Sequence, residues 1–365
     1  MIKEWQKVKR FVSLSKDFNL GKMGMLLIFL VFLIFALVTL PASANSITGC
    51  TKIVNAGYYT LENDIIDSNA PICINITSSD VIFDGAGHTL DGIGSVNSFG
   101  VYAYGGNTGI NNVTVKNLEV TDWMYGIIYI NVDGGRIENN ILKSDESGIL
   151  LSFSNSITIS NNTANSNENG VWLLLSSGNI IVGNIAKSNE YGFLLTYSSG
   201  NTISNNTAKS NDYGFYLEIS SDQNNISNNI VSSNGCGISL FFSGGSIWNN
   251  YFNNTKNVKD LVTHETKWNT TKTPGSNIVG GSYLGGNYWA KPDGTGFSQT
   301  CSDGDGDWIC DEGYELAASN IDYLPLKKPT LTPTPPAPIP EFPTVVLPAL
   351  AVVALLSLFQ RQKHR

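Results

Sequence analysis

The chain has 365 residues, of which 42% are hydrophobic and 14% charged, with 36 glycines and a formal net charge of −8. This composition suffices for a large core and excludes a coiled coil and a disordered chain. Residues 45–328 hold 13 Lys and Arg against 27 Asp and Glu, and this acidic balance of −14 repels nucleic acid and suits cations or a saline exterior.

Residues 1–44 have the pattern of a secretory signal peptide. Six Lys and Arg residues precede residue 23, and an apolar run from Met23 to Leu40 leads to small residues before Ala44, after which we expect cleavage. The run of about 18 residues is also long enough for an uncleaved membrane anchor. In either case the following residues lie outside the cell.

Residues 51–121 are expected to form the opening coils of a repeat architecture. The segments Val81–Gly92 and Val113–Val120 predict strands with a looser spacing than the next region, as is usual for terminal repeats. His88 lies between turn glycines with no second histidine nearby, and we interpret it as a turn residue.

The region from Gly126 to Phe252 repeats itself about every 22 residues. Glycine recurs, at intervals of 22 and finally 23 residues, at Gly126, Gly148, Gly170, Gly192, Gly214 and Gly237. Gly and Asn break every unit, which excludes helices, and segments such as Ile157–Ile159 predict strands of about three to five residues. One unit therefore closes best as one coil of an all-β, right-handed parallel β-helix, expected over residues 45–284, with equivalent strands about 4.8 Å apart.

Asparagine occupies two fixed positions in these units. One column is Asn140, Asn162, Asn184, Asn206, Asn229 and Asn250, and the other is Asp145, Asn167, Asn189, Asn211 and Asn234. Stacked amides can bond one another from coil to coil, and asparagine also suits turns with a strained backbone. Both interpretations remain open, and neither makes these residues catalytic.

The three residues after each repeated glycine define the two faces of a strand. By period-two alternation the first and third point into the core. These inward residues are Ile127, Ile149, Val171, Phe193, Phe215 and Ile238, and Tyr129, Leu151, Leu173, Leu195, Leu217 and Leu240. The second residue points outward, and there Trp172, Leu194 and Tyr216 belong to an apolar stripe. It predicts either a sugar-binding platform or a surface covered by the chain's own C-terminal segment or a neighbouring subunit.

Residues 285–328 form a predicted Gly- and Asp-rich capping segment. In its loop Asp303, Asp305, Asp307 and Asp311 can converge on a calcium ion, since most of them stand at every second position between glycines. The match to an EF-hand is partial, because Trp308 stands where glycine is expected. The alternative is a solvated acidic turn held by a disulfide.

Five cysteines follow the signal segment. In an oxidising compartment their spacing predicts the disulfides Cys50–Cys73 and Cys301–Cys310. Cys236 is left over at a repeat position that holds tyrosine in other coils, and it is interpreted as a coil residue instead of a nucleophile. Sequons for N-glycosylation lie at Asn75, Asn112, Asn161, Asn205, Asn225, Asn253 and Asn269.

The chain ends in a spacer and a hydrophobic tail. Residues 329–340 are a Pro/Thr linker, which is extended and unable to pack. Within residues 341–365 an apolar run, Thr344–Phe359, precedes the basic end Arg361–Arg365, which stays on the cytoplasmic side of a membrane. This tail either anchors the protein in the membrane or signals its own removal.

Two parts of the chain resemble known families. The coils, the segment Asp84–Gly92 and the ending Gly285–Leu326 resemble the NosD-like right-handed β-helix proteins that are common on archaeal surfaces. The Pro340–Pro343 motif with its tail resembles the PEF-CTERM sorting signal, which implies processing by an archaeosortase at the cell surface. The first resemblance also implies copper delivery for nitrous oxide reductase. Copper needs His, Met or Cys clusters, and the exported region offers only the scattered His88, His264 and Met124.

A polysaccharide-active lyase or hydrolase is the alternative function. Lyases of this fold need a strong base, often Arg or Lys, and hydrolases need paired carboxylates. Arg136 is the only exported arginine, and a site assembled across coils from Asp122, Asp145 and Lys143 is left open by the pattern. The sequence predicts no catalytic residue. It favours a non-enzymatic, surface-tethered structural or adhesive protein that binds envelope polysaccharide or surface-layer components.

Overall fold

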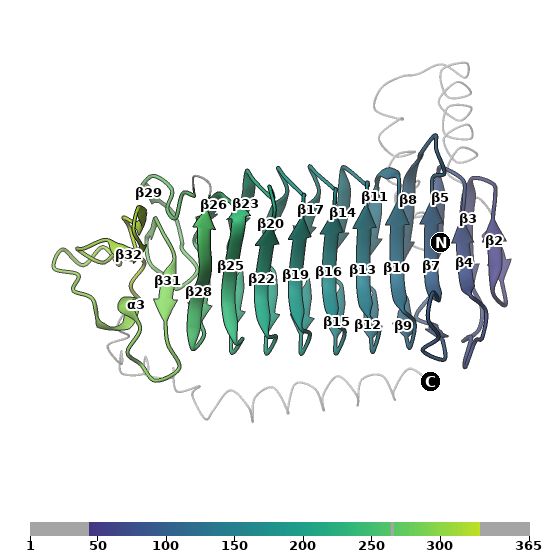
Figure 1. Cartoon of the computed structure of the whole chain (residues 1–365), viewed down its shortest axis with the longest axis horizontal. Helices are drawn as coiled ribbons and strands as arrows, with labels where there is room; N and C mark the ends of the chain where they lie inside the picture. Colours follow the sequence, from purple (N-terminus) through teal and green to yellow (C-terminus); the bar gives the residue numbers. More distant parts are fainter. Residues whose placement is uncertain (1–43, 264–265, 329–365) are drawn as a thin grey trace, which may run out of the picture. The chain divides into compact units, whose positions relative to one another are not determined.

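The computed structural model describes residues 44–263 and 266–328. Within this part the chain winds as a parallel β-helix, in which successive coils contribute strands to three long sheets that pair in parallel (Figure 1). Residues 22 apart lie side by side, since Ile127 pairs with Ile149 and Ile149 pairs with Val171. These pairings confirm the predicted fold class and its repeat length.

We name the three sheets A, B and C. Sheet A comprises β1 (Asn45–Ile47), β3 (Gly57–Leu61), β5 (Val81–Asp84), β8 (Ile110–Lys116), β11 (Val132–Glu138), β14 (Ile157–Ser160), β17 (Ile180–Val182), β20 (Thr202–Ser204), β23 (Asn224–Ser227) and β26 (Gly245–Trp248). Sheet B comprises β2 (Thr51–Ile53), β4 (Ile72–Ile76), β7 (Phe99–Tyr104), β10 (Tyr125–Ile130), β13 (Ser147–Ser152), β16 (Asn169–Leu174), β19 (Tyr191–Thr196), β22 (Tyr213–Glu218), β25 (Cys236–Ser243) and β28 (Lys256–Thr263). Sheet C comprises β6 (Thr89–Asp91), β9 (Glu119–Thr121), β12 (Ile141–Lys143), β15 (Thr163–Asn165), β18 (Ile185–Lys187), β21 (Thr207–Lys209), β24 (Ile230–Ser232), β27 (Tyr251–Asn253) and β31 (Tyr288–Ala290).

The end of the described part is irregular. Two antiparallel hairpins pair β29 (Thr273–Pro274) with β30 (Tyr283–Leu284) and β32 (Tyr314–Ala317) with β33 (Asn320–Asp322), and one short helix, α3 (Phe297–Thr300), lies between them in sequence. Because β31 joins sheet C, the coil continues past residue 284 into the predicted capping segment.

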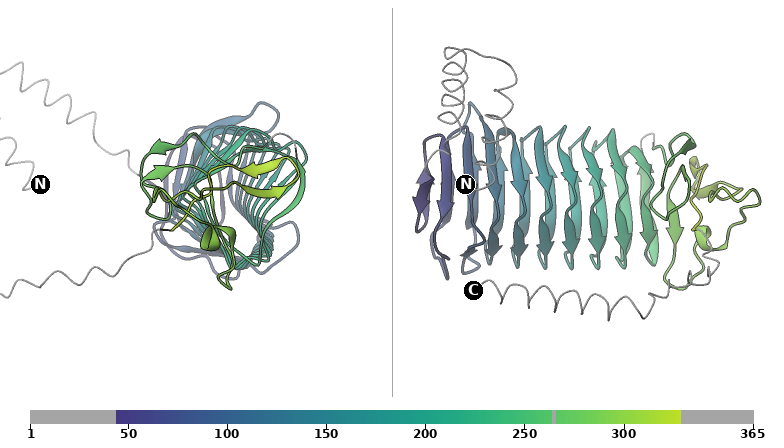
Figure 2. Two further views of the ribbon diagram at one scale, coloured as in Figure 1. Left: turned by 90° about the vertical axis from the view of Figure 1, so that its left-hand side faces the viewer. Right: turned by 180° about the vertical axis from the view of Figure 1, so that it is seen from behind.

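The interior of the β-helix is filled by stacked apolar side chains. Both columns predicted to point inward, which begin at Ile127 and Tyr129, are buried throughout. Phe193 and Phe215 stack in consecutive coils with their ring centroids 4.9 Å apart. Seen end-on, the three sheets surround this core (Figure 2).

The two predicted asparagine columns form buried hydrogen-bonded ladders. Oδ1 of Asn162 accepts both the backbone N–H and the side-chain N–H of Asn140, at 2.9 and 3.0 Å, and the pattern repeats from coil to coil. The strained turn backbone belongs to the preceding residue, such as Asn161 with a φ of 55° or Asn205 with 57°. The column residues therefore take the ladder role, and the turn with a strained backbone falls on the residue before each of them.

Two further ladders lie at the corner between sheets B and A. One consists of the amides of Asn179, Asn201 and Asn224. The other consists of hydroxyls that accept the backbone N–H of the preceding coil, on Ser154, Ser176, Ser198, Ser221 and Ser243. Both follow the same repeat, and neither was predicted from the sequence.

A buried carboxylate closes the C-terminal end of the core. Asp322 Oδ2 accepts the backbone N–H of Asn287 at 2.7 Å and the indole N–H of Trp289 at 2.8 Å. Asn287 also continues the first ladder, because its Oδ1 accepts from Asn250. Trp289 stacks on Phe252 with a centroid distance of 4.7 Å. The capping segment is thus the last layer of the coil.

Several predicted segments fall outside the described residues. These are the signal segment up to residue 43, the linker at 329–340 and the tail at 341–365. In the part of the chain that the structure does describe, no helix has the length and hydropathy needed to span a membrane.

Candidate functional site

A row of aromatic side chains runs along the outer side of sheet B. Register places Tyr102, Trp172 and Tyr216 in one outward column, because each lies in the position that Ile128 occupies in its own coil. Further aromatic rings lie beside this column at both ends of the strands. We call the whole set the aromatic face: Phe99, Tyr102, Tyr104, Tyr125, Trp172, Tyr191, Tyr213 and Tyr216.

The three predicted ligand-binding residues are neighbours on this face. Trp172 pairs with Leu194, and Leu194 pairs with Tyr216. Leu194 is only 8% exposed, whereas Trp172 and Tyr216 are half-buried. The two aromatic residues therefore offer contact area to a ligand, and Leu194 supports them from between.

Tyrosine rings form a compact cluster around Tyr216. The ring of Tyr191 stacks on Tyr213 at 5.4 Å, and both meet Tyr216 edge-on, at 5.4 and 5.2 Å. Partial burial, together with Glu190, raises the pKa of Tyr191 to about 12. The phenol of Tyr191 therefore stays protonated at neutral pH.

A short chain of hydrogen bonds links Trp172 to a carboxylate. The indole N–H of Trp172 donates to the hydroxyl of Thr196 at 3.3 Å, and that hydroxyl donates to Glu218 at 3.0 Å. This chain spans three neighbouring strands. It fixes the orientation of the indole ring on the outer side of the sheet.

An ammonium group borders the tyrosine cluster. Lys259 Nζ donates to the hydroxyl of Tyr213 at 2.8 Å and lies 3.5 Å from the carboxylate of Asp260. The hydrogen bond to Tyr213 raises the pKa of Lys259. Tyr191 and Tyr213 share a repeat position but were not predicted as site residues, and Lys259 was not predicted because the period is lost in its coil.

Exposed carboxylates line one side of the aromatic face, at the corner between sheets C and B. They recur once per coil as Glu146, Glu168, Glu190 and Asp212. Burial raises the pKa of Glu168, and the like charges of Glu146 and Glu190 add to this effect. The aromatic face is therefore flanked by acidic groups.

The acidic loop brings together three of its four predicted calcium ligands. Carboxylate oxygens of Asp303, Asp305 and Asp311 lie within 4.8 Å of one another. Asp307 instead pairs with Lys272. Backbone N–H groups of Gly304 and Gly306 donate to Asp311 and Asp303, which keeps these carboxylates in place.

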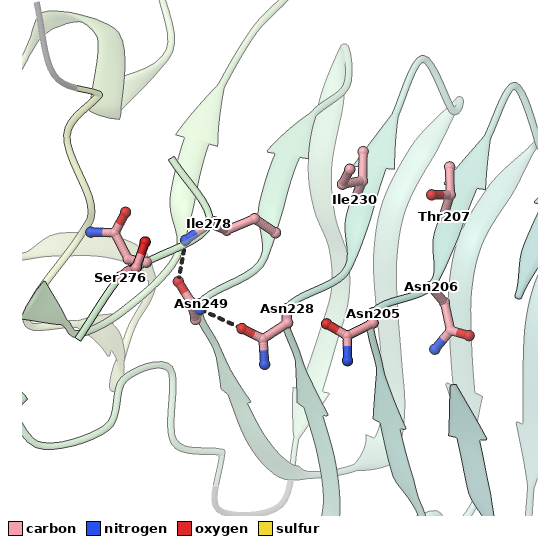
Figure 3. A pocket seen from close by; sticks show the side chains of 9 residues that line it. Asn205, Asn206, Thr207, Asn228, Ile230, Asn249, Ser276 and Ile278 are labelled. Carbon is pink, nitrogen blue, oxygen red and sulfur yellow. Dashed lines mark hydrogen bonds between the residues drawn. The ribbon is translucent and has the colours of Figure 1, made fainter. Parts of the chain in front are cut away.

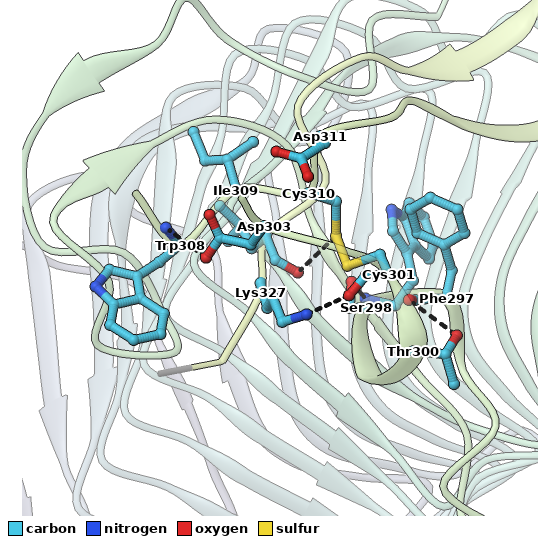
Figure 4. Close-up of a disulfide and its surroundings, with 12 residues drawn as sticks. Phe297, Ser298, Thr300, Cys301, Asp303, Trp308, Ile309, Cys310, Asp311 and Lys327 are labelled. Carbon is cyan, nitrogen blue, oxygen red and sulfur yellow. Dashed lines mark hydrogen bonds between the residues drawn. A yellow bond between two sulfur atoms is a disulfide. The ribbon is translucent and has the colours of Figure 1, made fainter. Parts of the chain in front are cut away.

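Both cysteine pairs expected from the spacing are joined in the structure. The Cys301–Cys310 disulfide lies directly beside the acidic loop (Figure 4), and Cys50 is bonded to Cys73 in the opening coils. Cys236 is free and buried, in register with Tyr213. Burial raises the pKa of its thiol to about 11, so it is no nucleophile at neutral pH.

The sequons differ in accessibility. Asn112, within β8, and Asn161 and Asn205, at corners, are exposed and have a left-handed backbone, whereas Asn75, Asn225, Asn253 and Asn269 are half-buried. A pocket of about 350 Å³ opens beside Asn205. Its wall is a row of corner asparagines, Asn205, Asn228 and Asn249, and the last of these accepts the backbone N–H of Ile278 (Figure 3).

The remaining candidate residues do not converge. Lys143 pairs with Glu119 at 2.7 Å, and Asp145 is buried within its asparagine ladder. His88 bonds Asp64 at 2.9 Å, while the sulfur of Met124 accepts a backbone N–H. Among the described residues, the only group of three or more converging His, Cys, Asp or Glu side chains is the acidic loop. Such an all-oxygen set suits calcium and does not fit copper.

Comparison with known structures returns matches of low similarity. A polygalacturonase from Erwinia carotovora subsp. carotovora is 13% identical, with a TM-score of 0.45 over 62% of this chain and 88% of its own. A variant of the periplasmic alginate epimerase AlgG is 17% identical, with a TM-score of 0.41 over 53% of this chain and 50% of its own. The Dettilon tailspike protein is 15% identical, with a TM-score of 0.42 over 58% and 46%.

The chain thus spans half the length of the epimerase and less than half of the tailspike protein. No curated protein matches it.

Two protein-family models match the chain. The PEF-CTERM archaeal protein sorting domain matches residues 339–363, and NosD, described as a periplasmic copper-binding protein, matches residues 43–294. The chain therefore belongs to the NosD family and ends in a PEF-CTERM sorting domain.

Proposed function

We propose that the protein is an exported cell-surface module that binds envelope polysaccharide through its aromatic face. The observation that carries this proposal is the cluster of Tyr191, Tyr213 and Tyr216 on the outer side of sheet B. Aromatic rings combine a large apolar contact surface with a polar tip. This combination matches a sugar ring, which has an apolar C–H face and hydroxyl groups around its edge.

Polar groups around the cluster supply the remaining recognition. The carboxylate of Glu218 accepts hydrogen bonds, the ammonium group of Lys259 donates them, and the hydroxyl of Thr196 does both. A sugar hydroxyl can therefore bind here as a donor or as an acceptor. Thr196 and Glu218 stand on β19 and β22, which pair on both sides, so this part of the binding surface is rigid and loses less entropy on binding. Lys259 lies on β28, the last strand of sheet B.

A polysaccharide-active enzyme is the second candidate. The pairing of Lys259 with Tyr213 at 2.8 Å favours it, since lyases and epimerases need a base beside the sugar. A general base works best with a pKa near the working pH, and here the pKa of Lys259 is raised and that of Tyr191 is about 12. These directions support binding over catalysis.

The C-terminal domain gives the place of action. A PEF-CTERM domain implies sorting, membrane anchoring and processing by a C-terminal processing enzyme, for which we propose an archaeosortase. The acidic exported region is compatible with a saline exterior. Copper delivery is not part of the proposal, because the donor atoms of the described residues do not fit that metal.

Retention on immobilised envelope polysaccharide tests the proposal. Tyr216→Ala should weaken retention about tenfold, which is typical of an aromatic anchor at the centre of a binding surface. Tyr323→Ala is the matched control, because Tyr323 is 66% exposed and lies in the capping segment. Equal retention of the wild type, Tyr216→Ala and Tyr323→Ala would contradict binding at the aromatic face. New reducing ends or unsaturated products after incubation with acidic polysaccharides would favour the enzyme.

A further inference from the structure

Large apolar side chains stand exposed at the corner between sheets B and A. Phe153, Leu175, Tyr197 and Phe242 occupy this corner in four coils, with exposed fractions of 55, 40, 48 and 47%. We call these four residues the apolar ridge. Each has a left-handed backbone, with φ between 48° and 51°. Such values are rare for bulky residues.

The corner itself does not require bulky residues. In the preceding coil the same corner holds Asn131, with a φ of 54°. The other two corners of the β-helix also pass through left-handed backbone once per coil, and there the residue is small and polar. These residues are Asn139, Asn161, Asn205, Asn228 and Asn249 at one corner and Ser144, Ser166, Ser188, Ser210 and Ser233 at the other.

Neither backbone preference nor burial accounts for the apolar ridge. A polar residue at these positions would relieve strain and remove apolar surface from water. Residues in sparsely populated backbone conformations persist where function requires them.

A column of polar side chains runs alongside the ridge, two residues further along the chain. Asn155 Oδ1 accepts the backbone N–H of Ser177 at 2.8 Å, and Ser177 Oγ accepts that of Ser199 at 3.2 Å. All three side chains are half-buried and uncharged. Acidic residues, Asp133 and Asp222, appear only at the two ends of this polar column.

The shape of this surface fits a linear polymer. The ridge is one residue wide, and from Phe153 to Tyr197 it repeats once per coil, at about 4.8 Å. A stable protein interface needs roughly 800 Å² from each partner, and a stripe of single residues does not provide that as a contiguous patch. We propose that the apolar ridge and the polar column bind a linear, uncharged polysaccharide lying along the axis of the coil. Its rings would pack on Phe153, Leu175 and Tyr197, and its hydroxyls would bond the polar column.

This inference rests on the proposed function and names a ligand class for it. Uncharged sugars are favoured over uronates, because the acidic ends of the polar column and the carboxylates beside the aromatic face repel anionic chains. The ridge also lies next to the outward residues Leu174, Thr196 and Glu218 of sheet B. Both surfaces can therefore contact one layer of polysaccharide.

The test compares binding of the full chain to a neutral β-glucan, a mannan and polygalacturonate. The ridge variant combines Phe153→Asn, Leu175→Asn and Tyr197→Asn, and it should fold because asparagine suits this backbone. Its thermal unfolding is measured in parallel. The control is Ile180→Thr, since Ile180 is 47% exposed on sheet A and has threonine on both sides, at Thr158 and Thr202.

We expect the wild type and the control to bind at least one neutral polymer, and the ridge variant to bind it about tenfold more weakly. Undiminished binding by a folded ridge variant would overturn the inference, and a loss confined to Tyr216→Ala would leave the proposed function intact. Binding of polygalacturonate alone would overturn the ligand class. Self-association that the ridge variant abolishes, without a change in glycan binding, would identify the ridge as an interface between copies. If the wild type bound no glycan, the proposed function would fail as well.

Discussion

The backbone N–H of Asp145 donates to Oδ1 of Asn167 at 3.0 Å, so a carboxyl group begins a column that continues with amides. In later coils the side-chain amide nitrogen of the ladder asparagine donates two hydrogen bonds. That of Asn189 bonds Asn211 Oδ1 at 3.0 Å and the carbonyl of Ala164 at 3.2 Å. Asp145 has the oxygen Oδ2 where the ladder asparagines have their amide nitrogen, and this Oδ2 has no hydrogen-bond partner among the described residues. Burial raises the pKa of Asp145 well above its usual range.

Replacing Asp145 by asparagine should stabilise the protein. The new amide can donate as the other ladder amides do, and a buried group that favours protonation is removed. We expect Asp145→Asn to raise the free energy of unfolding by about 1–2 kcal/mol at pH 8, as measured by chemical denaturation. A lower value would show that an amide side chain at this position does not donate as the other ladder amides do.

The same substitution at Asp322 should have the opposite effect. Both oxygens of Asp322 accept hydrogen bonds, from Asn287, Trp289 and Leu324. An amide nitrogen in place of one oxygen would face N–H donors. At pH 8, where the carboxyl group is ionised, Asp322→Asn should therefore lower the free energy of unfolding by about 1–3 kcal/mol. An unchanged value would contradict the assigned role of Asp322 in closing the core.

Stability should fall as the pH rises towards neutrality. Burial raises the pKa of Asp322 from 3.8 to about 7, so between these values the folded state binds a proton more tightly than the unfolded state. The contribution of this group is complete below pH 3.8 and is lost as the pH rises through 7. Asp145 acts in the same direction. Unfolding measured from pH 4 to 8 should show this decline, and Asp145→Asn should reduce it; a rise over this range would contradict both assignments.

Calcium should bind the acidic loop and stabilise the capping segment. Sites of this kind in extracellular proteins bind weakly, so about 10 mM calcium should raise the free energy of unfolding by about 1–3 kcal/mol. Asp311→Asn should abolish the increase, whereas Asp307→Asn should retain most of it, because Asp307 pairs with Lys272. A thermal shift assay with magnesium as the competing ion measures the effect. No shift in the wild type would favour a solvated acidic turn.

The periodic part of the structure could be predicted because each coil repeats the contacts of the last. The spacing of Gly126, Gly148 and Gly170 gave the strand register, since a constant separation in sequence becomes a constant neighbour in space. Contacts between residues at other sequence separations leave no periodic pattern in the sequence. Asn287 continues a ladder 37 residues after Asn250, and Lys259 reaches Tyr213 across 46 residues.

The outer surface was harder to predict than the core. Alternation identified Trp172 and Tyr216 as outward residues, but it did not show that Tyr191 and Tyr213 turn onto the same face. The apolar ridge was missed because left-handed backbone was expected only at Asn and Gly. Side chains such as Phe153 and Tyr197 reveal it only when their φ angles are known.

The fluorescence of Trp172 gives the most direct test of ligand binding at the aromatic face. Its indole is half-buried on this face and is held by Thr196, so a bound sugar ring would change its surroundings. We predict a saturable change in emission when envelope polysaccharide is added to the wild type, and no such change in Trp172→Phe. An identical response in both proteins, or none in the wild type at concentrations at which polysaccharide is bound, would contradict glycan recognition by the aromatic face.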